Sequence, residues 1–267
     1  MQDVTTWHDF SGKVVVVTGG ARGVGRAIAE RFLSVGADVV VCGRTEPEDD
    51  VLPRATGPTG AVHQAFFATA DVRDAEAVTE LMRTAVERFG RIDVLVNNAG
   101  GSPQVPAASA SPRFSASIVA LNLLAPIYCS QAANTVMQEQ DSGGVIVNIG
   151  SVSGVRPSPG TAAYGAAKAG LVSLTTSLAI EWAPKVRVNC ITAGLLWTGA
   201  WDDHYGGEVG RARIAATIPL GRFGSPDDVA DACLYLSSPV SSYVSGANLL
   251  IHGGGERPAF LDAAGNS

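Results

Sequence analysis

The segment Val14–Gly25 reads VVVVTGGARGVG: a run of valines, a glycine-rich turn, and the start of a helix that extends to about Val35. A continuous apolar strand is typical of a parallel sheet that is buried on both faces. Gly19, Gly23 and Gly25 allow a tight turn, a close approach of the backbone to a phosphate, and close packing of the helix on the strand. The amides at the helix N-terminus can bind a pyrophosphate. The segment therefore predicts a dinucleotide site, with an ordinary strand–helix turn as the alternative.

The alternation that begins at Val14 continues towards the C-terminus. Short β-branched runs alternate with amphipathic stretches, which indicates a parallel sheet with right-handed crossovers and helices on both faces. No internal repeat or interdomain linker interrupts the pattern, so we predict one α/β domain, a doubly wound parallel sheet in three layers. Besides the first strand and one before Asp71, strands are predicted at Val39–Val41, Val94–Val96, Val145–Ile149, near Arg187–Ile191 and at Asn248–Ile251.

Capping residues predict where the helices begin and end. Gly36 is placed to end the first helix in the left-handed conformation. Asp74 is a candidate N-cap, and Gly90 a stop, for a helix whose apolar residues follow a 3.6-residue spacing. Two further helices are predicted, over Ile118–Met137 and around YGAAK (Tyr164–Lys168), and two loops, over Thr45–Gly60 and from the fourth strand through Ser117.

The composition excludes several classes of function. The 267 residues are 46% hydrophobic and only 16% charged, with a net charge of −6 and a pI of about 5.2. Lysines and arginines form no block, so neither nucleic acid nor a membrane surface is an expected partner. No apolar run approaches the length of a membrane span. The N-terminus, MQDVTTWHDFSGK, has no signal-peptide pattern.

The four cysteines, Cys42, Cys129, Cys190 and Cys233, are far apart in the sequence. They form no C-x-x-C pair, and no histidine lies at ligand spacing. They are interpreted as buried thiols in a reducing compartment rather than as disulfides or a metal site. We therefore expect a soluble, cytoplasmic protein without a metal.

The stretch TAAYGAAKAG places Lys168 four residues after Tyr164, in a chain with only three lysines. On a helix, these two side chains lie on the same face. A nearby ammonium favours a phenolate, and it can help a tyrosine that titrates near pH ~10 to act as an acid or base. The alternative is a surface lysine beside a core tyrosine.

Several motifs together resemble those of the short-chain dehydrogenase/reductase family. The spacing T-G-x-x-x-G-x-G at Thr18–Gly25 differs from G-x-G-x-x-G and resembles that family's glycine motif, and Tyr164 and Lys168 resemble its catalytic Y-x-x-x-K. The resemblance extends from about Gly12 to Gly255 and implies a Rossmann-type fold in a single domain, residues 1–267. The other motifs in family order are Asp71-Val72, NNAG at Asn97–Gly100, Asn122, Ser151 thirteen residues before Tyr164, and TAGLLWT at Thr192–Thr198.

The resemblance implies a role for each of these residues. Asp71 is expected to bind the adenine amino group and Val72 to contact the ring, while Leu196 meets the nicotinamide carboxamide through its backbone. The expected catalytic set is Asn122, Ser151, Tyr164 and Lys168. The expected cofactor contacts are Gly19, Arg22, Gly23, Val24, Gly25, Arg44, Asp71, Val72, Asn98, Ala99, Gly100, Tyr164, Lys168, Leu196 and Thr198.

The end of the second strand predicts which nicotinamide cofactor binds. An acidic residue there binds the ribose 2′-OH of NAD, whereas an arginine accommodates the 2′-phosphate of NADP. Here Gly43 stands where the aspartate would be and Arg44 follows, with Arg22 as a second cation on the same side. We predict a preference for NADP(H), with NAD possible. The acidic residues Glu46, Glu48, Asp49 and Asp50 would oppose a phosphate if they folded back.

Carbonyl reduction needs a proton donor to the carbonyl oxygen. Tyr164 can supply the proton, and Ser151 can donate a second hydrogen bond to the same oxygen. Pro126, four residues after Asn122, has no N–H for the carbonyl of residue 122. In the family, the matching asparagine is thought to hold a water that leads protons from the lysine to solvent. A mere helix kink is the equal alternative.

The sequence departs from the family pattern in two places. Ala193 stands where proline is usual, and His252 replaces a common aspartate or asparagine, where a structural or subunit-contact role is expected. The variable segment after Leu195 carries aromatic residues that suit either a lid on an apolar pocket or packing. They are Trp197, Trp201, His204 and Tyr205; Val155, Pro157 and Ser102–Val105 are candidate pocket walls.

We predict an oxidoreductase that transfers a hydride between NADP(H) and a small or medium apolar carbonyl compound or secondary alcohol. The acidic MQEQDSGG (Met137–Gly144) weakens a role with acyl carrier protein. The alternatives are an NAD-dependent alcohol dehydrogenase and a redox sensor that binds the nucleotide without turnover. From the family, a homo-oligomer, dimer or tetramer, is expected through the two longest helices and the last strand.

Overall fold

One parallel sheet organises the molecule. The computed structural model describes residues 8–48, 51–198, 207–258 and 265. All adjacent strands of the sheet are parallel, which confirms the predicted α/β class and each predicted strand. In sheet order the strands are β5 (Phe66–Thr69), β2 (Asp38–Gly43), β1 (Val14–Thr18), β6 (Val94–Asn97), β7 (Gly144–Ser151), β8 (Val186–Ala193) and β9 (Asn248–Ile251).

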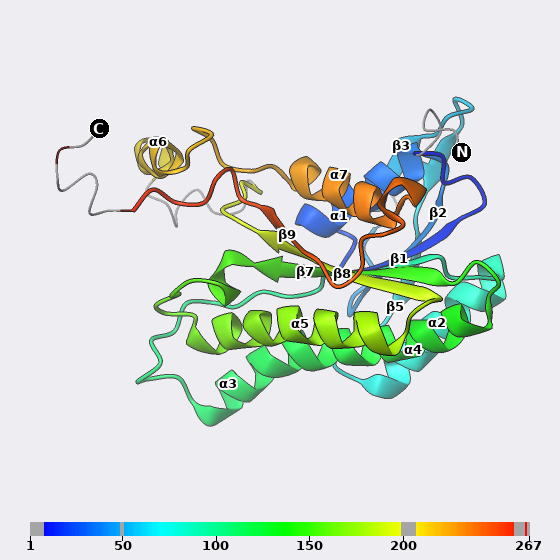
Figure 1. Cartoon of the computed structure of the whole chain (residues 1–267), viewed down its shortest axis with the longest axis horizontal. Helices are drawn as coiled ribbons and strands as arrows, with labels where there is room; N and C mark the ends of the chain where they lie inside the picture. The colour runs from blue at the N-terminus through cyan, green and yellow to red at the C-terminus, as the bar shows by residue number, and fades with distance from the viewer. Residues whose placement is uncertain (1–7, 49–50, 199–206, 259–264, 266–267) are drawn as a thin grey trace.

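Helices cover both faces of the sheet, as the alternation of elements predicted (Figure 1). Successive side chains of a strand point to opposite faces, so Val15 and Val17 pack in one core cluster with Phe32, whereas Val16 packs in the other with Leu81. One face carries α1 (Gly23–Ser34) and α7 (Pro226–Ser237); the other carries α2 (Ala75–Phe89), α4 (Ala125–Glu139) and α5 (Ala162–Glu181).

The predicted helix ends are confirmed by their capping geometry. Gly36, just past α1, has a φ of 91°. The Asp74 side chain accepts hydrogen bonds from the amides of Glu76 and Ala77, and Gly90 ends α2 with a φ of 83°. These are local signals, and the sequence was sufficient to predict them.

The prediction of a loop over Thr45–Gly60 is wrong in its second half. β3 (Arg54–Thr56) pairs antiparallel with β4 (Val62–Gln64) as a small hairpin. Its turn is closed by a hydrogen bond from Gly57 N to Ala61 O. Leu52 and Ala65 at the hairpin's two ends are buried in the α1-side core. This tertiary burial outweighs the local preference for a loop.

The long helix begins earlier than predicted, at Pro112 rather than Ile118. Ser111 caps it by accepting from the amide of Phe114. The helix runs without a break through α3 (Pro112–Val119), one π-helical turn (Ala120–Leu124) and α4. By length and composition Pro112–Glu139 could cross a membrane. Its apolar character is explained by packing, because residues such as Cys129 and Ala133 lie in the core beneath the sheet.

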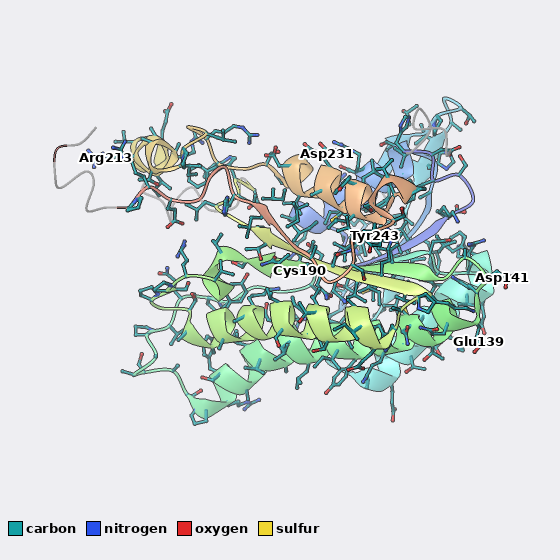
Figure 2. All side chains as sticks on the ribbon, in the orientation of Figure 1. Glu139, Asp141, Cys190, Arg213, Asp231 and Tyr243 are labelled. Carbon is teal, nitrogen blue, oxygen red and sulfur yellow. The ribbon has the colours of Figure 1, made fainter. Side chains whose placement is uncertain are left out.

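Helix α7 was not predicted, although its signal is present in the sequence. Ser225 and Asp228 form a reciprocal capping box in front of an apolar run. Asp231 of α7 (Figure 2) pairs with Arg31 of α1, which joins the two helices of that face. The remaining elements are α6 (Gly207–Thr217) and two short 3-10 helices, Val152–Gly154 and Pro239–Ser241.

The prediction that the cysteines are buried thiols is confirmed. All four are free and buried; Cys190, for example, lies on β8 within the sheet (Figure 2). Within the described part of the chain, no group of three or more histidine, cysteine, aspartate or glutamate side chains is arranged to hold a metal.

Candidate active site

The predicted site residues meet at the carboxyl edge of the sheet. The strand order reverses at β1, which pairs with β2 on one side and with β6 on the other. A crevice forms outside the strand ends at such a reversal, and ligands of doubly wound sheets bind there. The glycine turn follows β1, Asn98 follows β6, and Ser151 ends β7 in register with Ala193 of β8.

The glycine turn has the geometry of an anion site. Gly19 and Gly23 have φ values of 63° and 55°, and a Cβ added at Gly25 would lie 2.4 Å from both Asn98 Nδ2 and Gly19 O. Arg22 occupies the N-cap position of α1 without a side-chain capping bond. The first-turn amides, including that of Val24, therefore have no side-chain acceptor and can bind a pyrophosphate.

Gly20 is a further constraint of this turn that sequence reasoning missed. A Cβ at Gly20 would lie 2.4 Å from Val41 Cγ1 on the neighbouring strand. The turn therefore needs glycine at this position for packing on β2 rather than for backbone conformation. The doubled glycine in TGG was the available signal.

Thr18 and Asn98 join the glycine turn to the end of β6. Thr18 Oγ1 accepts from the amides of Asn98 and Ala99, both at 3.0 Å. Asn98 Nδ2 donates to the carbonyls of Thr18, at 2.9 Å, and Gly19, at 3.2 Å. The Asn98 amide group is thus engaged in shaping the crevice, and its contact with a cofactor stays a prediction.

Ser151 and Tyr164 are brought together as predicted. The Ser151 hydroxyl lies near enough to lower the pKa of Tyr164, but burial, the larger effect, raises that pKa above its ordinary value of 10. Ser151 Oγ also accepts from the amide of Ser153 at 3.2 Å. That amide occupies an acceptor site of the hydroxyl, so the Ser151 proton can be donated elsewhere.

Lys168 lies on the same face of α5 as Tyr164, as predicted. Its side chain is buried, and Nζ donates to the carbonyl of Ile149 at 2.7 Å. Nζ lies 5.7 Å from the centre of the Tyr164 ring. Burial lowers the pKa of Lys168 to about 8, and this lysine is not among the causes of the Tyr164 shift. The stabilisation of a phenolate by Lys168 together with the positive ring of a bound cofactor stays a prediction.

Asn122 is fully buried and holds the segment after β6. Its Oδ1 accepts from the amide of Gly101 at 2.9 Å, and its Nδ2 donates to the carbonyls of Gly101 and Ile118. The residue sits within the π-helical turn, where the amide of Ala125 donates to the carbonyl of Ala120. Such widened turns are frequent at functional sites. The water proposed to bind the Asn122 carbonyl stays a prediction.

Arg22 and Arg44 lie at the adenosine edge of the crevice without partners. Neither side chain forms a hydrogen bond or ion pair with any residue that the structure describes, and Arg44 is exposed. The described acidic residues Glu46 and Glu48 do not fold back onto them. Asp49 and Asp50 lie outside the described residues.

Asp71 lies on the same edge, with the buried Val72 next to it, and is paired with Arg73. Hydrogen bonds from Arg73 hold the pKa of the Asp71 carboxyl below its usual value, and the charge of Arg44 adds to this effect. Sequence reasoning missed Arg73, although its position two residues after Asp71 permits the pair.

The loop after β8 contains the predicted nicotinamide contacts. Leu196 forms an isolated bridge with Gly224, and Thr198 is partly buried. Trp197 packs edge-to-face on Phe223 at 6.0 Å, with the Arg211 guanidinium 4.7 Å above its ring. Trp197 is therefore a packing residue. Trp201, His204 and Tyr205 lie outside the described residues.

Two other expectations concern residues near the site. His252 lies against the nicotinamide loop, because a Cβ at Gly194 would be 2.6 Å from His252 Cβ, which agrees with a structural role. Val155 is 54% exposed. Pro157 lines a hollow beside Ala162 and Ala166 of α5, whose lining does not include Ser151 or Tyr164. Pro157 is thus placed away from the catalytic side chains.

Comparison with known proteins agrees with the motifs. Residues 19–256 match the family model described as enoyl-(acyl carrier protein) reductase. An uncharacterized oxidoreductase of Mycobacterium tuberculosis is 38% identical over 91% of each chain. The 3alpha-hydroxysteroid dehydrogenase of Mediterraneibacter gnavus is 37% identical over 90% of this chain and 96% of its own. A mutant of a Serratia marcescens short-chain dehydrogenase/reductase superimposes with a TM-score of 0.81 and 31% identity, covering 92% of this chain and 99% of that one.

The buried Lys168 predicts a pH-dependent stability. Its pKa is about 8 in the folded state and 10.5 in the unfolded chain. Between these values the unfolded state binds more protons, so this group's contribution to the free energy of unfolding rises with pH. Between pH 7 and pH 10.5, the free energy of unfolding of the wild type should rise by on the order of 3 kcal/mol relative to that of Lys168→Met.

Urea denaturation of both proteins across this range, in reductant, measures the difference. The buried thiols act in the opposite direction in both proteins, since burial raises the pKa of Cys42 and of Cys190 to about 11. They are therefore largely cancelled in the comparison. A difference that stays constant with pH would show that Lys168 is not titrated in this way.

A side chain added at Gly100 is expected to disturb the site, because Asn122 and Lys168 both lie close to this glycine. An added Cβ would lie 2.7 Å from Asn122 Oδ1 and 3.3 Å from Lys168 Nζ. Asn122 is held by three hydrogen bonds to the backbone, so it cannot move freely. Gly100→Ala should lower kcat roughly 10- to 100-fold, the range expected for a displacement near the chemistry.

Steady-state kinetics and thermal unfolding check this prediction. If the contact with Asn122 is responsible, the stability loss in Gly100→Ala should be smaller when Asn122→Ala is also present. Wild-type kcat in Gly100→Ala, or strictly additive stability losses, would contradict the proposed contact.

Proposed function

This chain belongs to the short-chain dehydrogenase/reductase family, and we propose that it transfers a hydride between NADP(H) and a small or medium apolar carbonyl compound or secondary alcohol. The family assignment makes it an oxidoreductase of CH–OH or C=O groups with a nicotinamide cofactor. The observation that carries the proposal is that the side chains of Ser151 and Tyr164 lie close together beside the buried Lys168.

Tyr164 serves as the general acid in reduction and as the general base in oxidation. Its phenol donates the proton to the carbonyl oxygen as negative charge develops there, and its phenolate removes one from an alcohol in the reverse direction. Ser151 donates a second hydrogen bond to the same oxygen, since the Ser153 amide uses only a lone pair of its hydroxyl and leaves the proton available. That bond from the Ser153 amide also holds the Ser151 side chain in place.

Lys168 contributes through its cation and its position. With a pKa of about 8 it is close to balance between its two forms near neutral pH, so it can exchange a proton with the site. Its bond to Ile149 O fixes the ammonium below Tyr164 on α5. Asn122, across Gly100 from Lys168, keeps the backbone at Gly101 in place.

The chain's own residues account for cofactor binding. Gly19, Gly23 and the uncapped amides of α1 would hold the pyrophosphate. A bound nicotinamide ring supplies or accepts the hydride and, when oxidised, brings a positive charge that favours a phenolate. Arg22 and Arg44, unpaired at the adenosine edge, support NADP(H) over NAD(H) because a guanidinium can hold a phosphate through two hydrogen bonds.

An apolar substrate is supported by the surroundings and by one relative. Trp197, in the loop that follows β8, packs on Phe223, between α6 and α7, and this pair makes the surroundings of that loop apolar. A relative with 37% identity is named a 3alpha-hydroxysteroid dehydrogenase, and a steroid alcohol is bulky and apolar. The name of that relative supports a substrate class and not a particular compound.

The experiment is NADPH oxidation over a panel of carbonyl compounds: an acetoacetyl thioester, bulky cyclic ketones and simple aldehydes, with NADH in parallel. Tyr164→Phe, which keeps the ring and removes the acid, should lower turnover at least about hundredfold. Faster turnover with NADH would favour the NAD-dependent alcohol dehydrogenase. Cofactor binding without turnover in either direction would favour the redox sensor.

We also propose that the protein is a homo-oligomer. Ile180 on the outer face of α5 is 81% exposed, and Leu250 on the edge strand β9 is 47% exposed. Tyr243, near the end of α7 (Figure 2), is fully exposed. These large apolar side chains lie on α5, on β9 and after α7, and their burial against a second copy of the chain fits the usual behaviour of the family.

Light scattering tests the assembly directly. The wild type should have a mass that is a multiple of 27.4 kDa, and Ile180→Glu should lower it by placing a charge in the interface. Val62→Glu is the matched control, because Val62 is 68% exposed on the hairpin, away from α5 and β9. A monomeric wild type would contradict the proposal.

A further inference from the structure

Asp71 and Arg44 are neighbours because their strands are paired. Gly43 at the end of β2 is in register with Thr69 of β5, and Ala70 N donates to Gly43 O at 2.9 Å. The residues that follow, Arg44 and Asp71, therefore leave the sheet side by side. The charge of Arg44 contributes to the lowered pKa of the Asp71 carboxyl, which confirms their proximity.

The Asp71 carboxylate is nevertheless occupied by another arginine. Oδ1 accepts from the amide of Arg73 at 3.1 Å and from its Nε at 2.9 Å. Oδ2 accepts from the same Nε at 3.2 Å and from Nη2 at 2.5 Å. A carboxylate has about four lone-pair sites. Arg73 thus directs three N–H groups at Asp71, one of them shared between the two oxygens, and uses most of that capacity.

This pairing explains why Arg44 has no partner. A carboxylate next to an exposed guanidinium would normally form an ion pair with it, and bidentate pairs are the strongest form of that contact. Because Arg73 already neutralises Asp71, neither Arg44 nor Arg22, at the start of α1, pairs with a carboxylate among the residues that the structure describes.

We propose that Arg73 is a positioning residue for cofactor selection: it occupies Asp71 and so keeps Arg44 available for the 2′-phosphate of NADP(H). The inference rests on the proposed preference for NADP(H). It also changes the expected role of Asp71, whose acceptor sites are directed to Arg73 and not left open for the adenine amino group. In this arrangement Asp71 affects cofactor selection indirectly, because it pairs with Arg73 and not with Arg44.

Calorimetry with two fragments of the cofactor tests the adenosine edge without catalysis. The probes are 2′,5′-ADP and 5′-AMP, which differ by the 2′-phosphate, and the quantity measured is the ratio of their dissociation constants. Arg73→Met keeps most of the aliphatic stem and removes the charge. Asp71 is then free to pair with Arg44, so the preference for 2′,5′-ADP should fall about tenfold, the cost of one charged hydrogen bond.

Two further variants separate this effect from a structural one. Adding Asp71→Asn to Arg73→Met removes the carboxylate that would capture Arg44, and should restore much of the preference for 2′,5′-ADP. Arg83→Met is the matched control: it removes another exposed, carboxylate-paired arginine of the same region, on α2, where Arg83 pairs with Glu80 and Glu87. Its ratio should equal that of the wild type.

The outcomes distinguish the inference from the function on which it rests. An unchanged ratio in Arg73→Met, an equal loss of both probes, or no recovery with Asp71→Asn would overturn the role of Arg73. A wild type that binds 5′-AMP more tightly than 2′,5′-ADP would overturn the NADP(H) preference. Even then, weaker relative binding of 2′,5′-ADP by Arg73→Met than by the wild type would still support the role of Arg73. Failure of the wild type to bind either probe would contradict both.

Discussion

A single hydroxyl at the end of β1 holds together the crevice on which the rest of the site depends. Thr18 Oγ1 accepts the amides of Asn98 and Ala99, so the turn after β6 is fixed against the turn after β1. The reversal of strand order opens a crevice at this point, but the reversal does not by itself set how far apart the two sides of the crevice lie. The hydrogen bonds from Asn98 to the carbonyls of Thr18 and Gly19 do so, and they leave the amides of α1 directed outwards.

The catalytic side of the crevice shows a conflict between stability and chemistry. Lys168 is only 3% exposed, and its ammonium donates to the carbonyl of Ile149. An ammonium in such a place opposes folding at neutral pH, because burial disfavours its charged form. Strained or costly groups persist where the surrounding structure is stable enough to hold them. Here α5 and β7 supply that stability, and the site gains a lysine whose pKa lies near the working range.

The strands of the sheet, the ends of α1 and α2 and the placing of the candidate site residues at one edge of the sheet could be predicted because each depends on local pattern: apolar runs, glycine at a left-handed turn, motif spacing. The hairpin β3–β4 could not, since its stability comes from Leu52 and Ala65 packing in a distant core. The same reason applies to Lys168. Its i+4 relation to Tyr164 was visible in the sequence, whereas the bond to Ile149, nineteen residues away, and the burial that reverses the expected shift of the tyrosine were not.

The two halves of the catalytic set are also joined through the core. Asn97 Nδ2 donates to Asn148 Oδ1 at 2.8 Å and to Ser130 Oγ at 2.9 Å, and Asn148 Nδ2 donates to Thr175 Oγ1 at 3.0 Å. This buried chain crosses from α4 through β6 and β7 to α5. Ser130, at one end, lies on α4, which continues from the π-helical turn that contains Asn122. Thr175, at the other end, lies on α5, the helix of Lys168. Buried polar groups of this kind are costly to separate, so the two helices cannot shift independently. The distance between Asn122 and Lys168, which no local pattern encodes, is thereby set by the core and not by the loops around the site.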